Sequence, residues 1–132
     1  MRMQRRDFLK AAGAAGAAGA MAGCASMPGG ASAGKVVVVG GGYGGATAAK
    51  YIRMWSGGRV DVTLVEPNES FVSCPLSNLV LGGSKTIADV TVPYSGLVKN
   101  HGGNLVRVVA TAIDTDKRVV RVASGASLHY DR

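Results

Sequence analysis

The chain has 132 residues, which is enough for one small domain. Its two cysteines, Cys24 and Cys74, are too few for a disulfide framework, and neither they nor His101 and His129 have the spacing of a metal site. The formal charge of +7 would by itself fit a nucleic-acid or membrane partner. The basic residues form no stripe with interleaved aromatic side chains, however, so the composition argues against a nucleic-acid-binding protein.

The first 33 residues differ in composition from the rest of the chain. Four basic residues and one acid lie within the first ten positions, and residues 11–22 contain only Ala, Gly and Met. This apolar stretch is too short to span a bilayer, which takes about 20 apolar residues. Residues 4–10 (QRRDFLK) resemble the twin-arginine export signal. We therefore predict that residues 1–33 are a twin-arginine signal peptide and that the protein is exported to the periplasm.

The end of this leader leaves alternatives for its processing. Cleavage after Ala31–Ala33 (ASA) would make Gly34 the new N-terminus. Met21–Cys24 instead resembles a lipoprotein box in which Cys24 carries the lipid, but Met stands where Leu is usual, and this favours the first reading. A helix that stays attached is the third alternative. Three glycines inside the stretch disfavour it, since each costs about 1 kcal/mol relative to Ala.

A strand and a glycine-rich turn open the second part of the chain. Residues 35–39 (KVVVV) are a β-branched run, which predicts a strand buried on both faces in a parallel sheet. Gly40, Gly42 and Gly45 then fit the pattern G-x-G-x-x-G. In this pattern the first glycine permits a tight turn, the second lets a pyrophosphate approach the backbone, and the third lets a helix pack close to the strand.

Residues 46–55 are predicted to form the helix that follows this turn. Its free backbone N–H groups and positive dipole end would face the phosphates of a nucleotide. Ala48, Ile52 and Trp55 fall on one face at spacings of four and three, which predicts an apolar side. Arg53 is expected to point to solvent.

A second strand is predicted over residues 60–65 and leads to Glu66. Glu66 lies 21 residues after Gly45, where an acid accepts hydrogen bonds from ribose hydroxyls in dinucleotide-binding folds. A solvated strand-end acid is the plainer alternative. Strand, turn, helix and acid together predict a Rossmann-like nucleotide-binding unit, although the glycine motif alone does not separate FAD from NAD.

The remaining residues predict one more parallel strand and an antiparallel meander. Residues 67–104 are irregular, with a short helix over residues 94–101, and a third strand is predicted over residues 105–109. Three short strands follow, at residues 111–114, 118–122 and 127–130. We therefore predict an α/β fold, a parallel Rossmann-like sheet followed by a β-meander, and the meander favours FAD as the cofactor.

Residues 34–132 resemble the N-terminal part of the flavoprotein subunit of flavocytochrome c sulfide dehydrogenase. Five stretches match in the family's order: residues 36–50 (VVVVGGGYGGATAAK), 62–68 (VTLVEPN), 73–83 (SCPLSNLVLGG), 110–114 (ATAID) and 130–132 (YDR). The segment SCPLSN is the most specific of them, because many flavoproteins share the glycine motif. The resemblance implies a periplasmic FAD-dependent oxidoreductase that oxidises sulfide and passes electrons to a c-type cytochrome subunit.

The resemblance also assigns site residues. The family's FAD-binding positions fall on Gly40, Gly42, Gly45, Glu66, Cys74 and Val106. Cys74 matches the cysteine that bonds covalently to the flavin 8α-methyl group through a thioether, and Val106 matches the third-strand backbone that meets the adenine. Phe71, Val72 and Ser73 stand where the family more often has aromatic residues and threonine.

The residues around Cys74 allow two interpretations, a flavin anchor or a residue that only packs. Cys74 precedes Pro75, which predicts an extended backbone at Cys74 and a thiol presented towards the cofactor. A small buried cysteine with no chemistry is the plainer alternative.

The family's redox-active disulfide falls beyond Arg132, so no catalytic residue is assigned. Residues 34–132 are expected to be the incomplete N-terminal part of an FAD/NAD(P)-binding domain, inactive on its own, with no transmembrane span. Two other functions remain as alternatives. One is a flavoprotein of the sulfide:quinone oxidoreductase type, and the other is a non-catalytic exported nucleotide-binding module.

Overall fold

The structure of the protein is a computed structural model, and it describes residues 32–132. The predicted signal peptide, apart from its last two residues, and the alternative lipid site at Cys24 lie outside the described residues.

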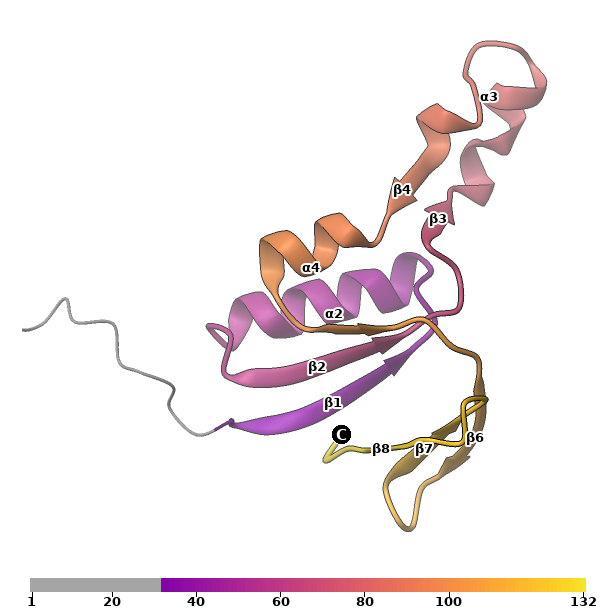
Figure 1. The fold of residues 1–132 in the computed structure, drawn as a ribbon. Helices are drawn as coiled ribbons and strands as arrows, with labels where there is room; N and C mark the ends of the chain where they lie inside the picture. Colours follow the sequence, from indigo (N-terminus) through magenta and orange to yellow (C-terminus); the bar gives the residue numbers. More distant parts are fainter. Residues whose placement is uncertain (1–31) are drawn as a thin grey trace, which may run out of the picture. The chain divides into compact units, whose positions relative to one another are not determined.

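A three-stranded parallel sheet carries the predicted nucleotide-binding unit (Figure 1). The strand β1 (Gly34–Val39) pairs along its whole length with β2 (Val60–Val65), and β2 pairs on its other edge with β5 (Asn104–Val106). Val62, Leu64 and Val65 of β2 are buried, because a central parallel strand is covered on both faces. The predicted α/β, Rossmann-like fold is confirmed.

The helix α2 (Tyr43–Trp55) connects β1 to β2 and starts three residues earlier than predicted. Its buried residue is Ala49, whose small side chain lets the helix lie close to β2. The prediction that Trp55 belongs to the buried face is wrong. Trp55 is the last helical residue, it is 81% exposed, and its ring lies against Tyr51 instead, with centroids 4.9 Å apart.

Arg53 is also placed differently from the prediction, since it does not point freely to solvent. Its guanidinium donates hydrogen bonds of 2.7 Å to the carbonyls of Gly58 and Val60 and one of 3.3 Å to that of His101. The turn after α2 passes through Gly57 and Gly58 at positive φ and brings the carbonyls of Gly58 and Val60 back towards the helix.

The stretch between β2 and β5, predicted to be irregular, contains a small two-stranded sheet. β3 (Ser70–Val72) pairs antiparallel with β4 (Thr91–Pro93). Between these strands the chain forms the 3₁₀ helix η1 (Cys74–Leu76), the helix α3 (Ser77–Leu81) and the 3₁₀ helix η2 (Ala88–Val90). The predicted short helix is present as α4 (Ser95–His101), which packs against α2 (Figure 1).

The predicted meander is present as β6 (Ala110–Asp114), β7 (Val119–Val122) and β8 (Ser127–His129), all antiparallel. Val120 and Val122 of β7 form one buried cluster with Val65 of β2, so the meander shares its core with the parallel sheet. The third strand is shorter than predicted, because the N–H of Val108 bonds to the carbonyl of Val106 and turns the chain there.

Candidate cofactor-binding site

The turn between β1 and α2 needs glycine at two positions for different reasons. Gly40 has a φ of +92°, a conformation that other residues rarely adopt. A Cβ on Gly45 would lie 1.8 Å from the carbonyl oxygen of Gly40, so a side chain there would push the helix away from the strand. Gly42 is the N-cap of α2, has no side-chain cap, and a Cβ there would meet nothing within 4 Å. The N-terminus of α2 is therefore open to a ligand.

Glu66 is buried at the end of β2, with 8% of its surface exposed. Its Oε2 accepts a hydrogen bond of 2.7 Å from the N–H of Gly41. Its Oε1 accepts bonds from the backbone N–H of Asn68 at 3.0 Å and from the Asn68 amide at 2.6 Å. Glu66 is thus not a solvated strand-end acid, and it lies against the glycine turn.

The charge state of Glu66 follows from these contacts. Burial pushes the pKa of the Glu66 carboxyl up, but the hydrogen bonds from Asn68 and Gly41 together outweigh it and hold the pKa below its ordinary value. The group is consequently an anion at neutral pH, fixed beside the turn and able to accept further hydrogen bonds.

Val106 lies next to Glu66 at the carboxyl ends of the parallel strands. The carbonyl of Val106 accepts a hydrogen bond of 3.0 Å from the N–H of Glu66, and Val106 pairs with Val65 in the sheet. In open α/β sheets, ligands bind at this edge. A groove of about 430 Å³ here is lined by both Gly42 and Glu66, so the structure brings these two predicted residues to one concave surface.

Tyr94 is a residue of this site that the sequence analysis missed. It is 5% exposed, and its hydroxyl donates a hydrogen bond of 2.8 Å to the carbonyl of Gly41. Burial and then the nearby charge of Glu66 raise the pKa of the Tyr94 hydroxyl. No motif marks Tyr94, because it precedes a short helix in a segment without periodicity.

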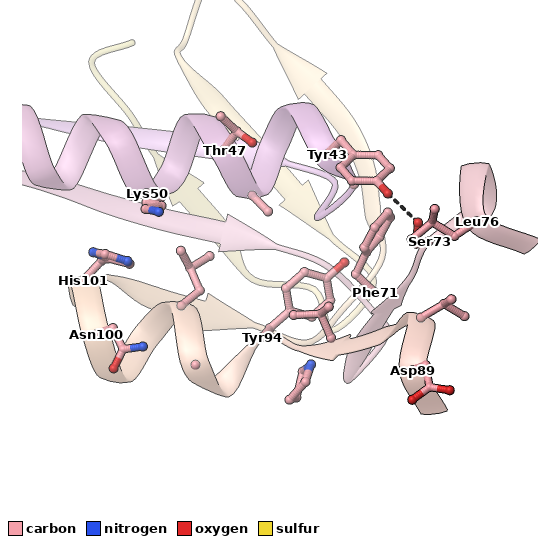
Figure 2. Close-up of a pocket in the computed structure, with 17 residues that line it drawn as sticks. Tyr43, Thr47, Lys50, Phe71, Ser73, Leu76, Asp89, Tyr94, Asn100 and His101 are labelled. Atoms are coloured by element: carbon pink, nitrogen blue, oxygen red, sulfur yellow. Dashed lines mark hydrogen bonds between the residues drawn. The ribbon is translucent and has the colours of Figure 1, made fainter. Parts of the chain in front are cut away.

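A second concavity lies between α2 and the segment β4–α4 (Figure 2). Its volume is about 500 Å³, and it shares Gly42, Phe71 and Tyr94 with the groove beside Glu66. Tyr43, Phe71 and Ser73 lie at one end of it, and polar side chains, including Lys50 and His101, lie at the other (Figure 2).

The segment that leads to Cys74 is fixed to the glycine turn. Ser73 is 5% exposed, and its hydroxyl is hydrogen-bonded to the hydroxyl of Tyr43, the residue after Gly42 (Figure 2). The ring of Tyr43 meets that of Phe71 edge-on, with centroids 4.7 Å apart. The residue before Cys74 is therefore buried and fixed to the start of α2.

Cys74 itself is a free, exposed cysteine. The prediction of an extended backbone at Cys74 is wrong, because Cys74 begins η1 and the extended residue is Ser73. The Ser77 hydroxyl donates a bond of 2.7 Å to the Cys74 carbonyl and stabilises this turn, while Pro75 is tolerated near the start of a helix, where no N–H is required. The thiol lines a hollow of about 400 Å³ with apolar side chains from α3 and η2.

Two features are absent from the part of the chain that the structure describes. Residues 32–132 contain no group of three or more His, Cys, Asp or Glu side chains that could hold a metal ion. Within the same residues, no helix is long and apolar enough to cross a membrane.

Comparison with known proteins defines the class. Residues 34–132 match the family model described as pyridine nucleotide-disulphide oxidoreductase, and the chain belongs to this family. Residues 2–22 match the signal sequence of the twin-arginine translocation pathway, which confirms the predicted export by this route.

The particular resemblance is also confirmed. The chain is 59% identical over 46 residues to the flavoprotein chain of the sulfide dehydrogenase (flavocytochrome c) of Chlorobaculum thiosulfatiphilum, covering 35% of this chain and 94% of that sequence. It is 29% identical over 97 residues to the mitochondrial sulfide:quinone oxidoreductase of Dictyostelium discoideum, covering 74% of this chain and 21% of the relative.

Solved structures agree with this assignment. The sulfide:quinone oxidoreductase of Aquifex aeolicus has a TM-score of 0.69 and 29% identity, over 75% of this chain and 23% of that one. Putidaredoxin reductase, in a covalent complex with putidaredoxin, has a TM-score of 0.62 and 28% identity, over 76% and 25% of the two chains. The chain spans about a quarter or less of the length of these structures and of the Dictyostelium relative.

Proposed function

We propose that this chain is the FAD-binding portion of a periplasmic sulfide dehydrogenase, which oxidises sulfide and passes the electrons to a c-type cytochrome subunit. The observation that carries the proposal is the 59% identity to the flavoprotein chain of a flavocytochrome c sulfide dehydrogenase. The twin-arginine signal agrees with it, because this pathway exports proteins from the cytoplasm.

The residues of the glycine turn fit FAD. The uncapped N-terminus of α2 at Gly42 supplies N–H groups and a positive dipole end for a pyrophosphate. Glu66 accepts three hydrogen bonds from protein, and an ionised carboxylate has about four acceptor positions, so capacity remains for a ribose hydroxyl. Val106 lies beside Glu66 at the strand ends, and the adenine would pack against its backbone.

Cys74 would anchor the flavin by a thioether to its 8α-methyl group. The link between Tyr43 and Ser73 supports this role, because it fixes the segment before Cys74 to the start of α2, where the pyrophosphate would bind. The exposed thiol is accessible to a ligand in the adjoining hollow. When bound, FAD would supply the site that accepts two electrons from sulfide and passes them on one at a time.

The test is sulfide-dependent reduction of a c-type haem by the holoprotein purified with its cytochrome subunit. On addition of sulfide, the absorption spectrum of the haem should change to that of the reduced form. The Cys74→Ser variant should retain less flavin and reduce less haem. A holoprotein that binds flavin but does not react with sulfide would favour a non-catalytic nucleotide-binding module.

A second candidate function has a specific observation in its favour. Both a curated relative and a solved structure named sulfide:quinone oxidoreductase match about three-quarters of this chain. An enzyme of that type would reduce a quinone with sulfide in the absence of any cytochrome. Comparing quinone and cytochrome as acceptors with the same preparation therefore separates the two candidates.

A further inference from the structure

We propose that Tyr94 is a positioning residue that orients the phosphate-binding N–H of Gly42 by holding the peptide group between Gly41 and Gly42. This inference rests on the proposed FAD binding, but not on sulfide as the substrate. Tyr94 lies outside the glycine motif, and Gly41 stands at a position of the turn that the motif leaves unspecified.

The backbone of Gly41 is held from both sides by buried groups. Its N–H donates to Glu66 Oε2 at 2.7 Å, and its carbonyl accepts from the Tyr94 hydroxyl at 2.8 Å. The two partners come from different elements, one from the end of β2 and the other from the residue before α4. The turn is therefore locked by groups that lie 25 and 53 residues away in the chain.

Because the peptide bond is planar, the hydrogen bond from Tyr94 to the Gly41 carbonyl also fixes the direction of the Gly42 N–H. In a trans peptide, the carbonyl of one residue and the N–H of the next lie in one plane and point in opposite directions. A hydrogen bond from Tyr94 to the Gly41 carbonyl thus turns the Gly42 N–H away from Tyr94. Because Gly42 is the N-cap of α2, that N–H is one of the helix-terminal donors without a partner inside the helix.

The packing of Tyr94 leaves no room for a side chain at Gly41. A Cβ on Gly41 would lie 2.4 Å from the Tyr94 hydroxyl oxygen and 2.5 Å from Cζ of its ring. The Gly41 N–H is already committed to Glu66, so it is not a donor for phosphate. The first donor that this turn can offer to a pyrophosphate is consequently the Gly42 N–H, which is the one that Tyr94 orients.

Removal of the hydroxyl alone tests the inference. In the full-length holoprotein with Cys74→Ser, Tyr94→Phe should accelerate FAD release by about two- to tenfold, the size expected for one neutral hydrogen bond. The ³¹P resonances of the bound pyrophosphate should shift as well, a change that a general loss of packing would not produce. Tyr51→Phe is the matched control, since Tyr51 lies on α2 against Trp55, and it should change neither measurement.

A second variant covers the case in which Tyr94→Phe fails to fold. A fluorinated tyrosine at Tyr94 keeps the ring but loses its proton, and hence its donor, at a lower pH. FAD release should then accelerate as pH rises through the pKa of the modified phenol, while the unmodified protein shows no such step. Unchanged release and ³¹P shifts in Tyr94→Phe, or the lack of that step, would overturn the inference. Failure of sulfide oxidation with these effects present would overturn only the proposed substrate.

Discussion

The carboxylate of Glu66 accepts a hydrogen bond of 2.7 Å from the backbone N–H of Gly41, and this contact joins the end of β2 to the turn after β1. A residue expected to bind ribose therefore also shapes the turn expected to bind the pyrophosphate. The buried position of Glu66 makes both roles sensitive to its removal, since truncation leaves the Gly41 N–H without its acceptor.

Glu66→Ala should weaken FAD retention by about 1.5–3 kcal/mol, the range for hydrogen bonds to a charged group, or about 10- to 150-fold in dissociation constant. The measurement is FAD dissociation from the full-length protein in the Cys74→Ser background, where no thioether hides the loss. Glu69→Ala is the control, because the Glu69 side chain is 82% exposed and forms only a surface ion pair with Arg107. Equal FAD affinity with and without Glu66 would show that it does not contact the nucleotide.

The lowered pKa of Glu66 predicts how stability depends on pH. A carboxyl whose pKa is lower in the folded state stabilises the fold fully above its unfolded pKa, near the ordinary value of 4.5, and loses that contribution as pH falls through the folded pKa. Glu66→Gln should therefore be less stable than the unmodified protein at pH 7, and the difference should shrink below pH 4.5. Urea unfolding across this range measures it, and a constant difference would contradict the role of the charge.

The sequence predicted the regular parts of the fold, and it failed where tertiary contacts decide. The valine-rich β1 and β2 are correctly predicted, because β-branched runs next to glycines leave few alternatives. The three meander strands are correctly predicted because turn residues separate them. The strands β3 and β4 have three residues each, too few for an alternation to be recognised. The position of Arg53 is not predicted because its acceptors are backbone carbonyls later in the chain, at the start of β2 and the end of α4.

The site shows the same division. The motif identified Gly40, Gly42 and Gly45 by spacing. The structure gives a physical reason for glycine at Gly40 and at Gly45, whereas a side chain at Gly42 would meet no atom of the protein. Tyr94 escaped notice because its partner is a backbone carbonyl 53 residues earlier, and no local pattern encodes such a contact. The turn at Cys74 also departs from the prediction, since the preference of a residue before proline is only a tendency and a hydrogen bond from Ser77 to the Cys74 carbonyl stabilises the turn.

The export signal gives a prediction that is independent of the fold. Replacing both residues of the pair, Arg5→Lys with Arg6→Lys, should keep the protein in the cytoplasm, because the translocation pathway reads the twin arginines. Arg2→Lys is the matched control outside the pair and should leave export unchanged. Immunoblots of periplasmic and cytoplasmic fractions measure the outcome, and normal periplasmic delivery of the double variant would contradict it.

The contact between Tyr43 and Ser73 predicts an effect on flavin attachment. Ser73→Ala removes one buried hydroxyl from the segment before Cys74, so the thiol should be held less firmly and the covalent fraction of flavin should form about two- to tenfold more slowly. Ser84→Ala is the control, because Ser84 is exposed and lies between α3 and η2. Attachment kinetics can be followed by acid-quenching samples during reconstitution with FAD, and equal rates in the two variants would remove Ser73 from the site.

Cys74→Ser tests the covalent anchor directly. It replaces the sulfur with a smaller oxygen at an exposed position and leaves the hydrogen bond from Ser77 to the backbone of residue 74 in place, so η1 should persist. The thiolate is the nucleophilic form of cysteine, whereas a serine hydroxyl is not appreciably ionised and should not form the bond. After acid denaturation and precipitation, flavin fluorescence should remain with the unmodified polypeptide and appear in the supernatant of Cys74→Ser. Release of the flavin from both proteins would leave Cys74 as a residue that lines the pocket without a covalent bond.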